Sequence, residues 1–565
     1  MAEKQATNRN VFASLQPFTS TNSADVDALS SESDDESVVT NASSNDEWTP
    51  EQEDRHASDG SVSPGRPSAQ DESDDETIAI APTKQKLTDT NPLPNFGSDA
   101  NTMVSKDKTE WFHKEPANRK TPIRNIVREG RSAHASDVST PVESIELFLG
   151  NDILDIIIEC TNKEGLKTFS KKKKSEWVDT DRVEIQALLA TLLSLGSMNQ
   201  GMIDLKLVFH EVWGSGFVRS LFGYNRLVTL LACLRFDDKD TRSTRKDKDP
   251  LAPIREVWDL FERSLKRHYS PGSFLTVDEQ LVPFRGRCKF RMYIPSKPDK
   301  YGLKIYWVCE SDTGYPLKGL PYLGKVGRLP EKDHGENCVK KLIEPYYRSG
   351  RNVTFDNFFT TLKLIQHLLR QGLTCVGTVR KDKKFIPEPL RHHSFSKDKQ
   401  YTSRFAFQEK ATMVSYKSKK NKVVTLLSTM HSDKTVSKDE KKPDIVAFYN
   451  STKGGVDGMD QKVHKYSCKQ KSHRWPMAYF FNIVDLACLA AHVVFKTKFP
   501  DHPLSGKDSR SHFIRSVASG LAQTQLFRRQ EIPTLHFVCS DFIDASNVTG
   551  NKGTGKSYNQ HKNGA

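Results

Sequence analysis

The spacing of apolar residues divides the chain into a polar beginning, a helical part, a strand-rich part and a second helical part. Residues 1–135 hold too few apolar residues to offset the entropy of folding, so we expect this segment to be disordered. From residue 140 to 270 apolar residues recur at helical spacing, as at Ile185, Leu188 and Leu192. This periodicity predicts a segment built from α-helices alone.

The pattern changes at Phe274, where apolar and polar residues begin to alternate as they do in half-buried strands. The elements predicted from this point are strands over 274–284, 302–312, 317–323, 352–359 and 374–380, and helices over 331–349 and 362–371. Residues 381–442 are basic and irregular, apart from one predicted hairpin with arms near 412–416 and 423–429. Helical spacing returns from Asp444 to about residue 500. Strands and helices in this order are typical of an α+β fold with a mixed sheet.

The longest apolar stretch runs from Met477 to Phe495. Asn482, Asp485 and His492 interrupt it, and such polar groups are costly inside a lipid bilayer. We therefore expect a buried core helix here and no membrane partner.

Charge is unevenly distributed along the 565 residues. Residues 1–100 contain 20 Asp and Glu against 6 Lys and Arg, a net charge of −14, whereas the remaining residues carry +27. A strongly basic body indicates a polyanionic partner, with nucleic acid the first candidate. The acidic beginning is interpreted either as a plain solvated tail or as a segment that folds back on the basic body and weakens nonspecific DNA binding. In both cases deletion of residues 1–135 should leave the fold intact.

The nine cysteines lie about twenty or more residues apart, so no pair has the spacing of a zinc finger, and we expect no zinc site. A disulfide framework is not expected at this density either. This usage indicates a reduced compartment, cytosol or nucleus, and the inferred DNA partner makes the nucleus our expectation. The N-terminus has no apolar run of the kind found in a secretory signal.

Three short motifs each allow two interpretations. Ser33–Glu36 and Ser73–Glu76 repeat a sequence that suits acidophilic kinases, but they are equally typical of a solvated tail. Lys171–Lys174 fits either a nuclear-localisation signal or a solvated helix face. Gly550–Ser557 matches the P-loop pattern, yet only eight residues follow it, too few for the helix that a P-loop needs. We interpret it as a chance match and expect no nucleotide cofactor.

Four aspartates lie within or directly beside predicted strands or a glycine turn. Asp278 lies within a predicted strand, Asp356 at the end of another, and Asp457 and Asp460 where a glycine turn opens a helix. Taken singly, each is interpreted as a cap or a turn residue. An Asp inside an apolar strand is costly unless it is paired or binds a metal, and three converging carboxylates suit Mg²⁺. Two such ions stabilise the attacking and leaving oxygens of phosphoryl transfer.

The longest motifs of the chain resemble the piggyBac transposases. They run from residue 276 to 306, 353 to 360, 376 to 380, 449 to 461 and 472 to 488, in the family's order. The resemblance implies a ribonuclease H-like catalytic core with an insertion, flanked by a split helical dimerisation and DNA-binding domain. It further implies that Asp278, Asp356 and Asp457 form the catalytic, metal-binding triad, with Asp460 an additional acidic residue of the site. Two Mg²⁺ ions per site (with Mn²⁺ as a substitute), a homodimer, and cleavage and joining of DNA at TTAA sites are the remaining implications.

The domain boundaries expected on this basis follow the changes in pattern. They are 1–135 (disordered), 136–272 (helical, first part), 273–382 (catalytic core, first part), 383–443 (basic insertion), 444–466 (core, last part), 467–545 (helical, second part) and 546–565 (flexible basic tail). Beyond residue 500 only Cys539 stands where the family usually has a cysteine-rich reader of the element ends. A domesticated, non-mobile, sequence-specific DNA-binding protein is therefore the alternative to an active transposase.

Two clusters of cations adjoin the acidic motifs. In the first, basic residues alternate with aromatic ones, which on a strand would place four cations on one face, either toward a phosphate backbone or along a solvated edge. The predicted DNA-binding residues of both clusters are Arg285, Arg287, Lys289, Arg291, Lys465, Lys469, Lys471 and Arg474. Trp475, beside the second cluster, is expected in the core rather than as a stacking platform for bases.

Overall fold

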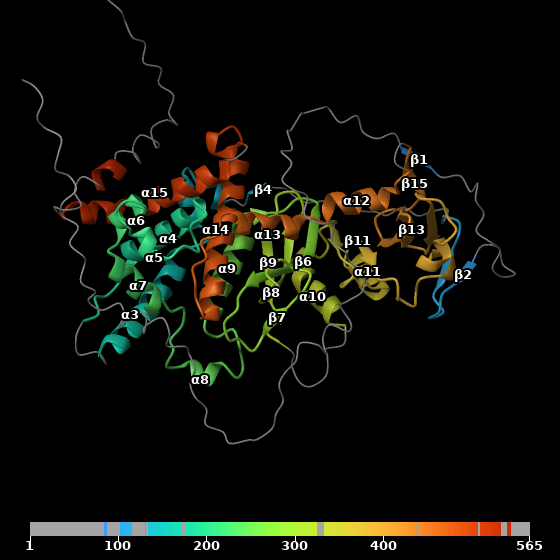
Figure 1. Cartoon of the computed structure of the whole chain (residues 1–565). Coiled ribbons are helices and arrows are strands. Elements are labelled where there is room, and N and C mark those ends of the chain that lie inside the picture. Colours follow the sequence, from blue (N-terminus) through green and yellow to red (C-terminus); the bar gives the residue numbers. More distant parts are fainter. Residues whose placement is uncertain are drawn as a thin grey trace, which may run out of the picture.

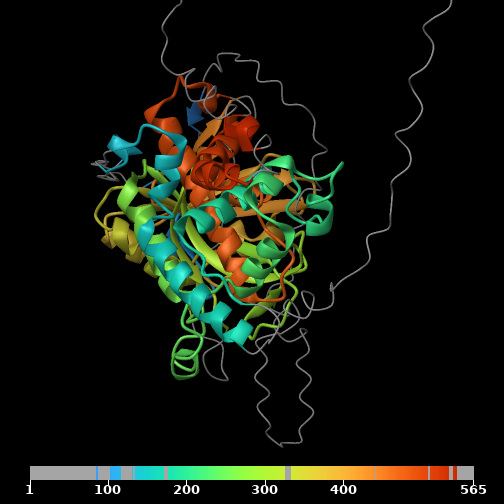
Figure 2. The same ribbon diagram turned by 90° about the vertical axis from the view of Figure 1, so that its left-hand side faces the viewer.

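In a computed structural model the protein is elongated, with helices at one end, a sheet in the middle and further strands at the other end (Figure 1). Figure 2 looks onto the helical end. The structure describes residues 84–86, 102–115, 130–131, 134–170, 176–324, 333–438, 441–506, 509–532 and 539–543. The predictions for Ser33–Glu36, Ser73–Glu76, Lys171–Lys174 and the glycine-rich Gly550–Ser557 lie outside the described residues.

The centre of the molecule is a mixed sheet, so the predicted α+β class is confirmed. Its middle strands lie in the order β9, β8, β6, β10, β11. β6 is parallel to β10, and β10 to β11, whereas β8 is antiparallel to β6 and to both β7 and β9. The bounds are β6 Phe274–Pro283, β7 Arg291–Tyr293, β8 Tyr301–Glu310, β9 Pro316–Pro321, β10 Asn352–Phe355 and β11 Thr374–Val379.

Two helices connect and cover these strands. α10 (His334–Ile343) precedes β10, and α11 (Leu362–Arg370) forms the crossover that lets β10 and β11 run parallel. Thr361 caps α11 by accepting a hydrogen bond from the Leu364 amide at 3.0 Å. Both helices lie within the ranges predicted from the sequence.

Beyond β11 the sheet continues through the basic insertion. β14 (Lys422–Ser428) pairs with β11, β13 (Thr412–Lys419) with β14, and β12 (Ser403–Phe407) with β13, all antiparallel. The hairpin predicted in this segment is therefore confirmed. A second apolar cluster forms here, separate from the main core, because these strands bury Phe405, Val414 and Leu426 together.

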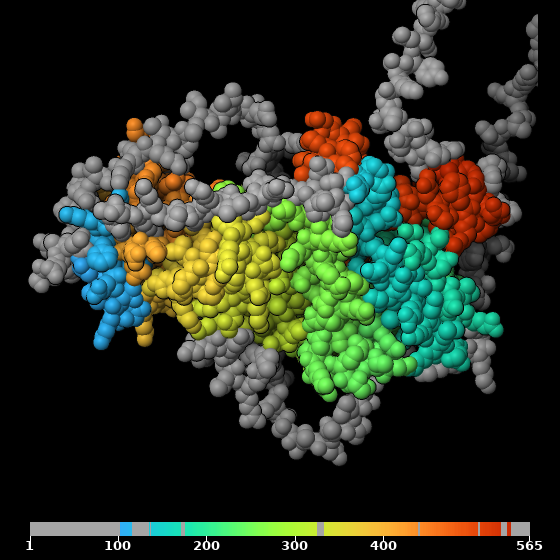
Figure 3. Space-filling view, turned by 180° about the vertical axis from the view of Figure 1, so that it is seen from behind, coloured from blue at the N-terminus to red at the C-terminus, as the bar shows by residue number. Residues whose placement is uncertain are grey.

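The expectation that all of residues 1–135 are disordered is wrong for residues 102–115. They form a hairpin of β2 (Thr102–Val104) and β3 (Glu110–Phe112), and β3 pairs with β12 at the end of the sheet. Trp111 is fully buried and its Nε1 donates a hydrogen bond to the Phe385 carbonyl at 2.8 Å. Figure 3 shows the hairpin in blue against the orange strands of the insertion. A deletion to residue 135 would remove this hairpin.

A further short strand of the same segment, β1 (Lys84–Lys86), pairs with β15 (Thr435–Ser437). The sequence signal for these strands was weak, since each has only three residues. β1 and β3 pair with strands roughly 300 or more positions away, so local periodicity could not reveal these pairings.

The helical end combines the helices that precede the central sheet in the sequence with the last helices of the chain. α15 packs along α4, and α14 packs against α2 and α9. The helices of this end are α2 Pro141–Glu146, α3 Asn151–Ser170, α4 Arg182–Ser197, α5 Leu205–Val208, α6 Gly216–Leu221, α7 Tyr224–Cys233, α8 Arg242–Arg245, α9 Arg255–His268, α14 Trp475–Lys498 and α15 Ser509–Gln530. The predicted helical segment up to residue 270 is confirmed, except that β5 (Tyr269–Ser270) closes it.

The apolar stretch around residue 485 is the central helix α14. Of the described helices it alone has the length and composition to cross a membrane, and its whole apolar window is buried inside the protein. Asp485 lies within it, where burial raises its pKa to about 6, and it accepts hydrogen bonds from the Ser467 hydroxyl and the Cys468 amide. The predicted core helix is thus confirmed.

Two shorter helices link the insertion to α14. α12 (Asp444–Thr452) and α13 (Gly455–Lys465) follow the insertion directly. α13 packs against β6 and β8. This contact places the glycine turn that contains Asp457 over the central sheet.

Candidate active site

Two of the predicted acidic residues lie side by side because of the register between two parallel strands. Val277 of β6 pairs with Phe355 of β10, so Asp278 and Asp356 occupy the next position on each strand. Neighbouring strands lie about 4.8 Å apart. Asp356 follows the last residue of β10, where its Oδ1 accepts a hydrogen bond from the Phe358 amide at 2.8 Å. The register therefore places these two carboxyl groups next to each other at the point where β10 ends.

The third predicted residue comes to the same strand through the start of α13. A Cβ atom on Gly455 would lie 2.7 Å from the Thr276 hydroxyl and 3.0 Å from the Glu310 carbonyl oxygen, so only glycine allows this approach. The Thr276 hydroxyl also donates a hydrogen bond to the Thr452 carbonyl at 2.6 Å. Asp457 stands exposed in the first turn of α13, two residues after this contact.

The pKa values of Asp278 and Asp356 are raised because these carboxyl groups lie at a partly buried position where several acidic groups come together. Burial raises the pKa of Asp278 well above its ordinary value, and the charges of Glu279, Asp356 and Asp457 raise it further. Burial and then Glu279 raise the pKa of Asp356 to about 6. Carboxyl groups that influence one another in this way are close in space although they come from three distant segments.

Asp460 has a different environment from Asp457. It accepts a hydrogen bond from Gln280 Nε2 at 2.9 Å, and its Oδ1 lies 3.3 Å from His464 Nδ1. The hydrogen bond to Asp460 raises the pKa of His464 to about 9, which favours the charged imidazolium. Asp460 thus joins α13 to β6 and to a cation.

Gln280 is a residue of the site that sequence reasoning missed. Its side chain is buried, and its Oε1 accepts hydrogen bonds from Trp307 Nε1 at 3.0 Å and Asn482 Nδ2 at 3.2 Å. With Asp460 as its third partner, Gln280 connects β6, β8, α13 and α14. The available signal was a glutamine directly before the apolar pair Leu281 and Val282 of a strand, where a buried amide needs hydrogen-bond partners.

Lys297 is the second residue that was missed. Its Nζ donates a hydrogen bond to the Glu279 carbonyl at 3.3 Å. Burial opposes its charge, but Glu279, Asp278, Asp457 and Asp460 outweigh that effect and raise the pKa of Lys297. No local pattern marks this lysine, because the loop that carries it meets β6 and α13 only in the folded chain.

The donor set fits magnesium better than zinc. Within the described residues no three His, Cys, Asp or Glu side chains are gathered tightly enough to form a ready cage for a metal. Mg²⁺ is commonly held by one or two carboxylates, with water and substrate phosphate as the other ligands. Asp278 and Asp356 are partly buried carboxyl groups with raised pKa values, and they would hold such ions together with the exposed Asp457.

The first predicted cationic cluster is a loop, so the prediction that a strand aligns its charges is wrong. Between β6 and β7 the chain turns, and β7 begins only at Arg291. Arg285, Arg287 and Lys289 are nevertheless exposed, while Phe284 and Phe290 are buried. The alternation of burial survives without strand pairing because the two rings anchor the loop in the core.

Arg291 holds this loop in place and is not a fourth exposed cation beside Arg285, Arg287 and Lys289. Its guanidinium donates hydrogen bonds to the carbonyls of Arg285 at 2.8 Å and Gly286 at 2.9 Å and lies 5.4 Å from the Tyr301 ring centroid. Its charge therefore fixes the loop conformation.

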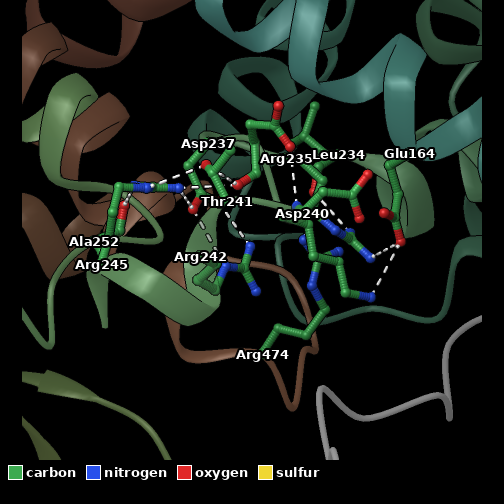
Figure 4. Close-up of polar contacts among 12 residues, drawn as sticks. Glu164, Leu234, Arg235, Asp237, Asp240, Thr241, Arg242, Arg245, Ala252 and Arg474 are labelled. Atoms are coloured by element: carbon green, nitrogen blue, oxygen red, sulfur yellow. Dashed lines mark hydrogen bonds and ion pairs between the residues drawn. The ribbon is translucent and has the colours of Figure 1, made fainter. Parts of the chain in front are cut away.

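The second predicted cluster divides in the same way. Lys465 and Lys471 are exposed, whereas Lys469 donates a hydrogen bond to the Pro283 carbonyl at 2.7 Å. Arg474 donates to the carbonyls of Ala232 at 3.0 Å and Leu234, at the end of α7. Figure 4 shows it beside the ion pairs of Arg235 with Glu164 and of Arg242 and Arg245 with Asp237. Because its guanidinium is engaged inside the protein, the prediction that Arg474 contacts DNA is not supported.

The two cationic segments adjoin one another. A Cβ atom on Gly286 would lie 2.5 Å from the His473 carbonyl oxygen, so the backbones are in direct contact. The Phe290 and Trp475 rings meet edge to face at 5.1 Å. Trp475 packs against the main core, as expected. The exposed Arg285, Arg287 and Lys471 are close to this contact in the sequence, and we refer to them with the exposed Lys289 and Lys465 as the cationic surface.

A known transposase family matches the part of the chain that forms this site. The family model described as "Transposase IS4" matches residues 140–492. PiggyBac transposable element-derived protein 3 of Homo sapiens is 24% identical over 371 residues, which cover 61% of this chain and 60% of that protein. PiggyBac transposable element-derived protein 2 of Homo sapiens is 22% identical, with 62% and 60% covered. The chain thus spans less than two thirds of these relatives.

A solved structure agrees with this match. The cryo-EM structure of the piggyBac transposase synaptic complex with hairpin DNA superposes with a TM-score of 0.69 at 36% identity. The likeness covers 74% of this chain and 87% of that one. With a family match over more than half of its length, this chain belongs to the piggyBac-type transposase family.

Proposed function

We propose that this protein is a DNA transposase or nuclease that cleaves and joins strands at TTAA sites by Mg²⁺-dependent phosphoryl transfer. The observation that carries the proposal is the convergence of acidic residues from three segments. Asp278 and Asp356 follow paired residues of parallel strands, and the start of α13 brings Asp457 onto the same strand. Acidic side chains gathered in this way are unfavourable for stability unless a cation joins them.

We further propose that the central sheet is a ribonuclease H-like core. The order β9, β8, β6, β10, β11, with parallel neighbours on one side of β6 and antiparallel ones on the other, supports this assignment. The basic insertion then lies between β11 and α12. The packing of α15 on α4 and of α14 on α2 supports a helical domain split between two parts of the sequence.

In the proposed mechanism, Asp278, Asp356 and Asp457 hold two Mg²⁺ ions, with Mn²⁺ as a substitute. Bound ions would polarise the scissile phosphate and the attacking oxygen. Asp460 and Gln280 hold α13 in place against β6, so that Asp457 keeps its position relative to Asp278. The partly buried sheet edge limits water and strengthens each electrostatic interaction.

We propose that DNA lies across the cationic surface beside these carboxylates. A family member in complex with hairpin DNA is the structural neighbour, and the exposed cations lie at or after the ends of β6 and α13, the elements that carry Asp278 and Asp457. Phosphate contacts of this kind position a duplex without reading its sequence. We also propose that the protein acts as a homodimer on chromosomal DNA in the nucleus. Imaging of a fluorescent fusion protein tests the nuclear location.

The second candidate is a domesticated protein that binds DNA without cleaving it. The names of the human relatives favour it, since both are described as derived from a transposable element. Acidic residues at every proposed ligand position favour retained chemistry.

Incubation of the full chain with supercoiled plasmid and with a TTAA-tipped hairpin oligonucleotide tests the proposal. We expect nicked plasmid and opened hairpin in Mg²⁺ or Mn²⁺ but not in EDTA, and no product from Asp278→Asn. DNA binding without any product in either metal would favour the domesticated protein.

A further inference from the structure

The loop between β7 and β8 is a closed turn that holds one lysine over the carboxylates. The Lys297 amide donates to the Ile294 carbonyl at 3.1 Å, the Ile294 amide to the Lys300 carbonyl at 2.7 Å, and the Lys300 amide to the Lys297 carbonyl at 3.2 Å. Lys300 has a positive φ of 54°, which tightens the turn. The Lys297 side chain is partly buried, so the turn directs it inward.

The turn is attached on both sides of the site. On the strand side, Lys297 Nζ donates to the Glu279 carbonyl of β6, next to Asp278. On the helix side, Asp299 Oδ2 lies 3.6 Å from His464 Nε2, and His464 in turn pairs with Asp460 of α13. The turn therefore bridges β6 and α13, two of the three elements whose carboxylates would hold metal.

Four acidic groups raise the pKa of Lys297 against the effect of its burial. They belong to Asp278 and Glu279 on β6 and to Asp457 and Asp460 on α13. One hydrogen bond to a neutral carbonyl uses one of the three ammonium protons, which leaves two donors for other partners.

We propose that Lys297 is a catalytic residue that exchanges partners: its ammonium offsets the carboxylates in the metal-free protein and donates to the scissile phosphate when metal ions occupy them. This inference rests on the proposed phosphoryl-transfer function. In that reaction the bond from the attacking oxygen to phosphorus forms as the bond to the leaving oxygen breaks. Lys297 forms no covalent bond and keeps its three protons, while its charge stabilises the extra negative charge on the phosphate oxygens.

The same arrangement gives Lys297 a measurable effect without DNA. A fixed ammonium among the carboxylates repels an incoming divalent cation. Removing it should therefore strengthen metal binding while weakening catalysis, a combination that a merely structural lysine would not produce.

The test compares three variants of the full chain: Lys297→Gln, Lys297→Arg and the control Lys300→Asn. Lys300 lies in the same turn with an exposed side chain, and asparagine tolerates its positive φ. Circular dichroism melting first establishes that each variant folds. Mn²⁺ affinity is measured by calorimetry without DNA, DNA affinity in Ca²⁺, and the cleavage rate of the hairpin oligonucleotide in Mg²⁺.

We expect Lys297→Gln to bind Mn²⁺ about tenfold more tightly. Cleavage should slow about 100-fold with DNA affinity unchanged, as for loss of one transition-state donor. Lys297→Arg should retain wild-type Mn²⁺ affinity and at least about a tenth of the rate, because it keeps the charge. Lys300→Asn should behave as wild type.

Wild-type cleavage by Lys297→Gln, or an equal rate loss in Lys300→Asn, would overturn the catalytic role. An unchanged or weaker Mn²⁺ affinity in Lys297→Gln would overturn the electrostatic role. If the wild-type chain itself does not cleave DNA, the proposed function fails. The Mn²⁺ measurement still decides whether the Lys297 ammonium weakens the binding of a divalent cation to the carboxylates.

Discussion

The insertion and the middle of the central sheet use buried charge in opposite ways. In the insertion, Lys417 is buried and donates hydrogen bonds to the carbonyls of Phe395 at 2.8 Å and Asp398 at 2.7 Å. Around β6 and β10, Asp278 and Asp356 are partly buried beside further acidic groups, and their pKa values are raised. In the insertion, backbone carbonyls satisfy the buried ammonium of Lys417. The middle of the sheet leaves a charge conflict that a cation would resolve, and such conflicts are typical of functional sites.

The largest effect should follow substitution of a carboxylate beside the middle of the sheet. Asp457→Asn should slow Mg²⁺-dependent hairpin cleavage about 1,000-fold, since losing several kcal/mol of metal-mediated stabilisation slows a reaction tenfold per about 1.4 kcal/mol. DNA affinity and thermal stability should change little, because Asp457 is exposed.

Asparagine separates a metal ligand from a helix cap, since it caps about as well as aspartate. The structure makes Gly454 the N-cap of α13, and wild-type cleavage by Asp457→Asn would exclude Asp457 as a metal ligand. Asp460→Ala is expected to be milder, because Asp460 positions α13 through Gln280 and His464.

The insertion end should show the reverse pattern, with lost stability and retained chemistry. Trp111→Ala should lower the free energy of unfolding by about 3–5 kcal/mol, the usual cost of deleting a large buried aromatic side chain. Cleavage by the folded fraction should be unchanged, because the hairpin lies at the far end of the sheet from β6.

Urea denaturation measures this cost, with Phe112→Ala as the control. Phe112 is the next residue and is 37% exposed, so its loss should cost much less. Equal stabilities for Trp111→Ala and wild type would show that the hairpin does not pack against the insertion.

The cationic surface gives a third contrast, between exposed and internally bonded cations. The triple variant Arg285→Gln, Arg287→Gln and Lys289→Gln should reduce the slope of log affinity against log salt by about 2–3, at roughly 0.9 per phosphate contact. Arg474→Gln should leave that slope unchanged and lower the melting temperature, because it removes hydrogen bonds to the end of α7. Fluorescence anisotropy over a salt series measures the slope. An equal slope for the triple variant and wild type would place the DNA elsewhere.

The smallest effect concerns pH. The folded pKa of Asp356, about 6, lies above its ordinary value of 3.8, so the folded state binds a proton that the unfolded state releases between these values. The contribution of Asp356 to stability therefore falls as the pH rises from about 4 to 6, by on the order of 1 kcal/mol.

Comparing wild type with Asp356→Asn at each pH isolates this contribution from those of other carboxylates. Mg²⁺ should restore the lost stability of wild type above pH 6 and leave the variant unchanged. A difference that does not depend on pH would contradict the raised pKa.

Local periodicity by itself determined most helices and strands, because the side chains of one element reveal which face is buried. The strands around Asp278 and Asp356, the crossover helix between β10 and β11, and the hairpin of the insertion all lie where alternation or helical spacing placed them. The acidic candidates were found for a related reason, since a carboxylate in an apolar strand conflicts with its own neighbours.

Only the tertiary structure decided which residues meet. Trp111 joins a strand almost 300 positions away, Arg474 bonds to carbonyls about 240 positions away, and Lys297 lies over carboxylates of two separate elements. A short polar strand, an arginine and a lysine look alike in sequence whether they face solvent or a partner. Their roles depend on non-local pairing, because the energy of a buried ring or charge is set by the groups that surround it after folding.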